Sequence, residues 1–178
     1  VVAVVAACEN LISGGAYKPG DVIGSMSGKT IEVDNTDAEG RITLADALYY
    51  TATVIKPSKM VDLATLTGAC VVALGSLNTG AITNNQPLMD EIKEASQEAG
   101  EFIWQLPSNE EYKEQNKSHV ADIKNSGGRG AGATTAGLFL QEFVEDVPWV
   151  HLDIAGTAYL SKPRGYLPKG ATGVPVKT

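Results

Sequence analysis

The sequence is poor in cysteine, since Cys8 and Cys70 are the only two and lie far apart. They lack the short spacing of a structural zinc site, and we expect two small buried hydrophobic residues in a reducing compartment instead of a disulfide. Histidine is equally scarce. His151 lies in a strand-like run, where packing or a backbone hydrogen bond is expected, with metal ligation as the alternative. No Ser-His-Asp order matches a hydrolase triad.

Basic residues are also few, with 14 Lys and Arg against 21 Asp and Glu, for a net charge of -7. This balance argues against a nucleic-acid surface, which needs clustered cations. Long apolar runs are missing too. Residues 1–7 are apolar, but a membrane span needs about 20 residues and a signal peptide needs a charged start. We expect residues 1–5 to form a strand buried on both faces, so that the chain is a piece of a longer protein.

The chain has the length of about one domain, and its 43% apolar content is enough for a core. Apolar runs and helical periodicity alternate along it. The predicted strands are residues 29–33, 60–66, 102–106 and 149–154. The predicted helices cover residues 42–55, 86–99 and about 136–147. The first strand, first helix and second strand predict a parallel, right-handed crossover. The tail from residue 161 is expected to be irregular.

The most informative stretch is Asn35-Thr36-Asp37-Ala38-Glu39-Gly40-Arg41, which lies between a predicted strand and a predicted helix. In an extended segment, Asp37 and Glu39 share a face, and two such hard oxygen donors suit a divalent cation. Arg41 offers a planar fork for a carboxylate, carbonate or phosphate. The alternative is that the acidic pair only caps a helix or faces solvent. Similarly, the glycine-rich loop 126–132 either cradles an anion at a helix start or is merely flexible.

This stretch closely resembles the signature of the leucyl (cytosol) aminopeptidase family of dinuclear metallopeptidases. The resemblance continues in family order along essentially the whole chain. It includes Val5-Ala6-Ala7-Cys8-Glu9-Asn10, Ala64-Thr65-Leu66-Thr67-Gly68-Ala69 and His151-Leu152-Asp153-Ile154-Ala155-Gly156. Residues and resemblance together predict an α/β fold of three layers, in which a central, mostly parallel (mixed) sheet is flanked by helices.

The resemblance implies a cytoplasmic enzyme that releases N-terminal amino acids, with a preference for leucine, from peptides. Two divalent metals (Mn or Zn, with Mg or Co as alternatives) would activate water. Asp37 and Glu39 match metal ligands, and Arg41 matches the catalytic arginine that retains a bicarbonate. The substrate-binding positions that match are Thr65, Leu66, Gly68, Ala155 and Ala158. The resemblance also implies peptide substrates and a homo-hexamer, with no membrane and no nucleic-acid partner.

The family pattern requires further aspartate and lysine residues that would precede the first residue of this sequence. We therefore interpret residues 1–178 as part of a catalytic domain that lacks its N-terminal portion. Two carboxylates cannot satisfy two metals, so the 178 residues alone are expected to bind metal weakly and to be essentially inactive. Two alternatives stay open: a non-catalytic DNA-binding role, as some relatives have, and a scaffold that keeps the fold without the chemistry.

Overall fold

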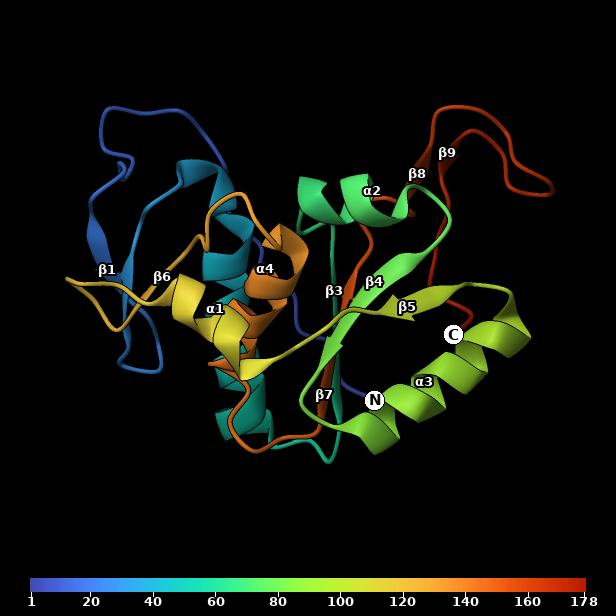
Figure 1. Ribbon diagram of the computed structural model, residues 1–178, viewed down its shortest axis with the longest axis horizontal. Helices are drawn as coiled ribbons and strands as arrows, with labels where there is room; N and C mark the ends of the chain where they lie inside the picture. The colour runs from blue at the N-terminus through green and yellow to red at the C-terminus, as the bar shows by residue number, and fades with distance from the viewer.

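The computed structural model describes residues 1–178, and its centre is a four-stranded mixed sheet (Figure 1). The strand order is β3 (Met60–Ala64), β7 (Trp149–Asp153), β4 (Thr79–Thr83) and β5 (Ile103–Gln105). The β3–β7 and β4–β5 pairs are parallel, and the β7–β4 pair is antiparallel. The predicted mixed, mostly parallel sheet is therefore confirmed. Strand β4 was not predicted.

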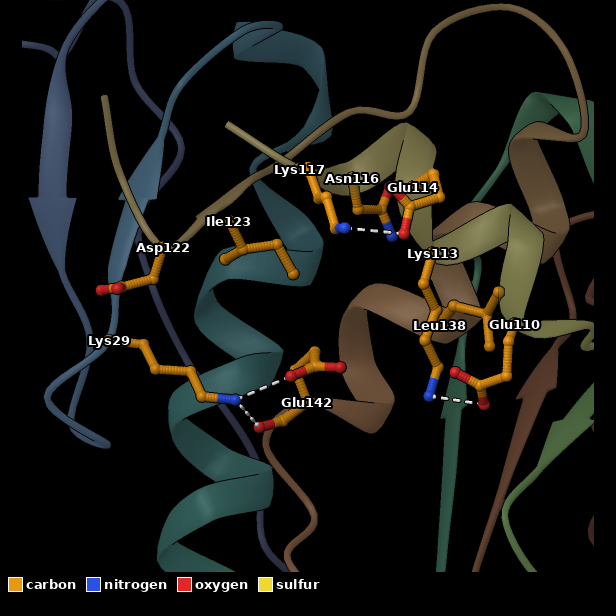
Figure 2. A pocket seen from close by; sticks show the side chains of 10 residues that line it. All are labelled: Lys29, Glu110, Lys113, Glu114, Asn116, Lys117, Asp122, Ile123, Leu138 and Glu142. Atoms are coloured by element: carbon orange, nitrogen blue, oxygen red, sulfur yellow. Dashed lines mark hydrogen bonds and ion pairs between the residues drawn. The ribbon is translucent and has the colours of Figure 1, made fainter. Parts of the chain in front are cut away.

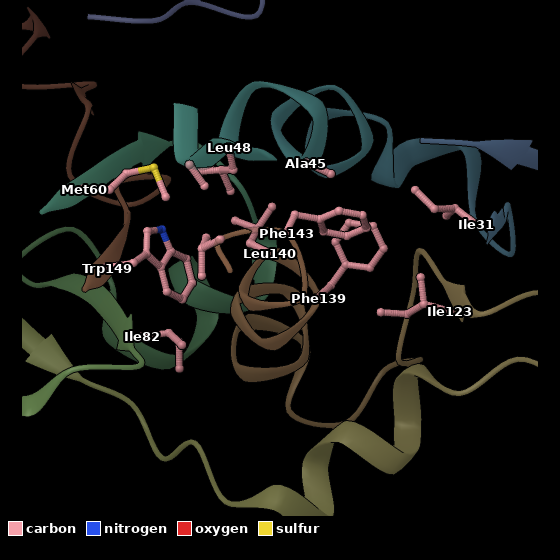
Figure 3. Close-up of a cluster of buried hydrophobic side chains, with 12 residues drawn as sticks. Ile31, Ala45, Leu48, Met60, Ile82, Ile123, Phe139, Leu140, Phe143 and Trp149 are labelled. Atoms are coloured by element: carbon pink, nitrogen blue, oxygen red, sulfur yellow. The ribbon is translucent and has the colours of Figure 1, made fainter. Parts of the chain in front are cut away.

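Helices cover both faces of this sheet. On one face, α1 (Gly40–Tyr50) and α4 (Gly132–Gln141) pack over Met60, Ile82 and Trp149 (Figure 3). The rings of Phe139 and Phe143 lie 5.2 Å apart in this cluster. On the other face, α3 (Gln86–Ala99) covers a smaller cluster, which includes Ala81, Leu88, Met89, Ile103, Val150 and Leu152. The three-layer α/β architecture is confirmed.

Local sequence signals explain the helix ends. The side chain of Asn85 accepts a hydrogen bond from the Leu88 amide, 3.0 Å away, and so caps α3. Gly100 ends that helix in the left-handed region at φ 69°. Helix α1 continues through a π-helical turn, η2 (Thr51–Ile55), and stops at Lys56, which also has a left-handed backbone. The short 3-10 helix η3 (Glu110–Asn116) lies between β5 and the next strand in the chain.

A second, three-stranded sheet consists of β1 (Val22–Gly24), β2 (Thr30–Glu32) and β6 (Ile123–Lys124). The predicted parallel crossover from β2 through α1 to β3 is wrong, because β2 and β3 belong to different sheets. Strand β2 pairs with β1 on one edge and with β6 on the other, so it has no free edge for β3. In the tail from residue 161, which was predicted to be irregular, β9 (Gly170–Ala171) pairs with β8 (Tyr159–Leu160), which lies just before it.

The predicted buried strand at residues 1–5 is also wrong. Residues 1–12 form no helix or strand and make no backbone hydrogen bond, and most of them are exposed. An apolar run forms a strand only where it pairs with a neighbour, and no strand of the chain pairs with this run, although one edge of β3 is free. Cys8, which lies in this segment, is exposed, whereas Cys70 is buried as predicted, and both are free thiols.

Two further elements differ from their predictions. The strand predicted at residues 60–66 ends at Ala64, and Gly68 begins the helix α2 (Gly68–Leu74), which Thr67 caps and which was not predicted. The predicted helical register up to Val147 is too long, since α4 ends at Gln141 and Glu145 has a positive φ of 51°. Phe143 nevertheless lies in the core, where a turn that continues α4 brings it, since its amide donates to the Leu140 carbonyl oxygen.

Candidate active site

The segment from Asn35 to Arg41 is helical. The Asn35 side chain accepts a hydrogen bond from the Asp37 amide at 2.9 Å and caps the 3-10 helix η1 (Thr36–Ala38). Glu39 has helical angles, and α1 begins at Gly40. The prediction that Asp37 and Glu39 share the face of an extended segment is therefore wrong. The polar cap starts a helix directly, and in a helix residues three or four apart share a face.

This conformation brings Asp37 and Arg41, four residues apart, to one hollow of about 230 Å³. Glu39 does not line this hollow. Its side chain is half-buried and accepts a hydrogen bond from the Asn10 amide group at 3.3 Å. The structure thus brings two of the three predicted residues of the signature together and leaves the third beside them.

Three loops form the walls of the hollow, which we call the signature hollow. They are residues 35–41, the β3–α2 connection, and the glycine-rich loop that precedes α4. Of the predicted substrate-binding residues, Leu66 and Gly68 line it, together with Thr67 between them. The other predicted positions do not line it; these are Thr65, Ala155 and Ala158.

Arg41 is the one buried cation among these side chains, with 8% of its surface exposed. Its Nη1 donates to the Asn125 carbonyl oxygen at 2.9 Å, and its Nε has no partner in the chain. Burial lowers the pKa of Arg41 to about 10, while the carboxylates of Asp153 and Glu39 oppose this shift. The guanidinium therefore stays charged at neutral pH and keeps donor capacity for an anion.

Asn125 supports the site from beneath, and the sequence prediction missed it. It is fully buried. Its Oδ1 accepts hydrogen bonds from the Asp34 and Asn35 amides, and its Nδ2 donates to the Asn35 and Ala38 carbonyl oxygens. Together with its bond to Arg41, these contacts fix the shape of the signature loop. No local pattern reveals this role, because every partner lies more than 80 positions away in the sequence.

The glycine-rich loop is held in place by close contacts. A Cβ at Gly127 would lie 2.7 Å from the Thr135 side chain, and a Cβ at Gly132 would lie 2.9 Å from that of Ala69. In the amide orientation that satisfies both ends of its side chain, Gln115 donates to the Gly127 and Gly130 carbonyl oxygens. Glycine is therefore needed for close approach at positions 127 and 132, and the loop forms a defined wall.

His151 lies in the sheet beneath this region, where it is buried and bonded to a carboxylate. Its Nδ1 lies 2.7 Å from Asp62 Oδ1, and the Trp149 indole donates to Asp62 Oδ2 at 2.6 Å. Burial alone would lower the pKa of His151, but the charge and hydrogen bond of Asp62 outweigh it and raise this pKa. The expectation that His151 is packed is confirmed, although its partner is a side chain and not the backbone.

Comparison with known proteins decides the family. The profile of the "Cytosol aminopeptidase family, catalytic domain" matches residues 1–178. The chain belongs to the cytosol aminopeptidase family. It is 71% identical over its whole length to a probable cytosol aminopeptidase of Clostridium tetani, and 58% identical to one of Treponema denticola. The chain spans 37% and 38% of the length of these two relatives.

Solved structures agree with this assignment. A mutant of tomato leucine aminopeptidase matches with a TM-score of 0.90 and 49% identity, over 96% of this chain and 33% of that one. The bottromycin maturation enzyme BotP matches with a TM-score of 0.88 and 40% identity, over 92% of this chain and 37% of that one.

No helix of the structure has the length and apolar character that a membrane crossing requires.

The residues of this chain fit only part of a metal site. Asp37 and Glu39 supply hard oxygen donors, which suit divalent cations, and the exposed Asp37 carboxylate accepts no hydrogen bond in the chain. No group of three or more His, Cys, Asp or Glu side chains is placed to hold a metal ion.

A larger hollow, of about 350 Å³, lies elsewhere, between Lys29, Ile123, η3 and α4 (Figure 2). Its charges pair with one another. Lys29 contacts Glu142 at 2.8 Å, and Lys113 contacts Glu110 at 3.0 Å. Lys117 and Glu114 form a third pair. Because its lysines are already neutralised, this paired-charge hollow is a weaker candidate for chemistry than the signature hollow.

Proposed function

We propose that the full-length protein carrying this chain is a dinuclear metal-dependent aminopeptidase that releases N-terminal amino acids, preferentially leucine, from peptides. In this proposal residues 1–178 are part of the catalytic domain, and the N-terminal portion of the domain lies outside them. The observation that carries the proposal is the signature hollow, where Asp37, the buried Arg41 and the Leu66–Gly68 segment meet. Family membership supports the same activity.

Asp37 and Glu39 would hold the metal ions, zinc or manganese, with Glu39 as the candidate to bridge both. When bound, such ions lower the pKa of a coordinated water toward about 7. Two carboxylates cannot complete the coordination of two metal ions, so we expect weak metal binding by the 178 residues alone.

Arg41 would retain a bicarbonate that accepts and returns the proton of the attacking water. Its burial and its unpartnered Nε suit this role, because a small anion acts as a base only if a fixed cation holds it. The Leu66 carbonyl oxygen, which accepts no hydrogen bond within the chain, would accept one from the substrate amine. Thr65, Ala155 and Ala158 are proposed as more distant substrate contacts, and a hexamer as the assembly.

The test is hydrolysis of a leucine anilide by the full-length protein during titration with zinc or manganese. We expect metal-dependent turnover that is lost in Asp37→Asn. The 178-residue chain alone is expected to show essentially none. Absence of turnover by the full-length protein at any metal concentration would refute the proposed activity, whereas strong turnover by the short chain would show that the missing ligands are misassigned.

A further inference from the structure

We infer that Asp153 is a positioning residue, which holds the Leu66–Thr67 peptide so that the Leu66 carbonyl oxygen faces the signature hollow as the acceptor for a substrate amine. This inference rests on the proposed function. Asp153 ends strand β7 and is 2% exposed. It does not line the hollow and is not one of the residues that the signature predicts.

The carboxylate of Asp153 accepts hydrogen bonds mainly from Leu66 and Thr67, which line the hollow. Oδ1 accepts hydrogen bonds from the Leu66 amide at 3.1 Å and from the Thr67 amide at 3.4 Å. Oδ2 accepts from the Thr67 hydroxyl at 2.7 Å. The Ala155 amide also donates to Oδ1 at 3.1 Å. No lysine or arginine forms an ion pair with Asp153, so its buried charge is stabilised by these donors.

Sheet register places Asp153 beneath this wall. Strands β3 and β7 run parallel, with Ala64 opposite Asp153, and the Ile154 amide donates to the Ala64 carbonyl oxygen at 2.9 Å. The two strands thus end side by side, and the segment after β3 passes over the carboxylate. The Thr67 hydroxyl, held by Asp153, also accepts from the Cys70 amide at 2.9 Å and caps α2.

Peptide geometry gives the consequence. In a trans peptide, the carbonyl of one residue and the amide N–H of the next point in opposite directions. The Thr67 N–H points at the buried Asp153, so the Leu66 carbonyl in the same peptide plane points away from it. Leu66 lines the hollow, and its carbonyl oxygen accepts no hydrogen bond from any other group of the chain. Asp153 therefore determines which way this acceptor faces.

Asp62 provides a matched control. It is another buried carboxylate, on the adjacent strand β3, and it bonds His151 and Trp149 without contacting the wall of the hollow. A loss of general stability should follow from replacing either aspartate. A change in recognition of an amine should follow only from replacing Asp153.

The experiment compares two inhibitors in the full-length protein with zinc: L-leucinol, which carries the amine, and 4-methylpentan-1-ol, which lacks it. In Asp153→Asn we expect the inhibition constant of leucinol to rise about tenfold and that of the alcohol to stay unchanged. In Asp62→Asn neither constant should change. Equal weakening of both inhibitors by Asp153→Asn, or no change in either, would overturn the inference. If Asp153→Asn does not fold, Thr67→Val removes one of the bonds and should give a selective rise of about threefold.

Hydrogen exchange separates this inference from the proposed activity. If the wild-type protein hydrolyses no leucine anilide, the proposed function fails, but the amides of Leu66 and Thr67 still report on Asp153. We expect them to exchange faster in Asp153→Asn and at the wild-type rate in Asp62→Asn. Unchanged exchange at both amides in Asp153→Asn would refute the positioning role.

Discussion

The two hollows of the molecule differ in how their charges are satisfied. The paired-charge hollow is the larger, at about 350 Å³, but its lysines face carboxylates at 2.7 to 3.0 Å. The signature hollow, at about 230 Å³, contains a buried guanidinium with an unpartnered N–H and an exposed carboxylate that accepts no hydrogen bond. A buried cation with spare donors is costly for the fold, so its presence points to a ligand, whereas volume alone does not.

The largest loss of activity is expected for Arg41→Met in the full-length protein. Loss of the buried cation should reduce kcat for a leucine anilide by about 100-fold or more, the usual effect of removing a proton-transfer or charge-stabilising group. Lys113→Met in the paired-charge hollow is the matched control and should change kcat less than about twofold. Steady-state kinetics measure both, and similar losses in the two variants would erase the distinction between the hollows.

Asn125→Ala should destabilise the protein by about 2 kcal/mol, because it leaves the amides of Asp34 and Asn35 without their shared acceptor. The free energy of unfolding from urea titration measures this cost. Activity should fall as well, since Arg41 loses its fixed surroundings. An Asn125→Ala variant as stable as the wild type would show that the signature hollow does not depend on the hydrogen bonds of Asn125.

The pH dependence of stability should follow the buried His151 and not the exposed charges of the paired-charge hollow. The groups around His151 are Asp62 on β3, Asp153 on β7 and Arg41 on α1. Since its folded pKa is raised above about 6.5, its contribution is fully present below that pH and is lost as pH rises through the raised value. Thermal unfolding between pH 6 and 9 should therefore show a decline that disappears in Asp62→Asn. A decline of equal size in Asp62→Asn would assign it to other groups.

The smallest effect is expected for Lys117→Met, which removes an ion pair whose partners are 68% and 64% exposed. Such pairs contribute about 0 to 1 kcal/mol and weaken with salt. Urea unfolding at low and high salt should give nearly the same stability for this variant and the wild type. A loss approaching that of Asn125→Ala would mean that the paired-charge hollow is also a critical structural element.

The contrast between local and distant partners explains what the sequence could predict. Helix α3 was predicted well because its cap Asn85, its first-turn Pro87 and its terminal Gly100 all act within one segment. The pairing of β2 with β6 was not predicted, because β6 consists of only two residues and lies some 90 positions away in the sequence. The apolar run at residues 1–5 suggested a strand, but a strand requires a neighbour that composition does not specify.

The candidate site shows the same limit. The signature pointed to Asp37 and Arg41, which do line one hollow, and to Leu66 and Gly68 beside them. The extended conformation assumed for the acidic pair is wrong, because a capped helical turn replaces it and leaves Glu39 beside the hollow. Asn125 and Asp153 could not be predicted, since each acts on backbone groups brought close only by the fold.

The location of the metal centre can be measured directly by anomalous diffraction from crystals of the full-length protein prepared with zinc or manganese. We predict two anomalous peaks beside the carboxylates of Asp37 and Glu39, at the signature hollow. Peaks confined to the carboxylates of the paired-charge hollow, Glu110, Glu114, Asp122 and Glu142, with none beside Asp37, would contradict the assignment of the active site.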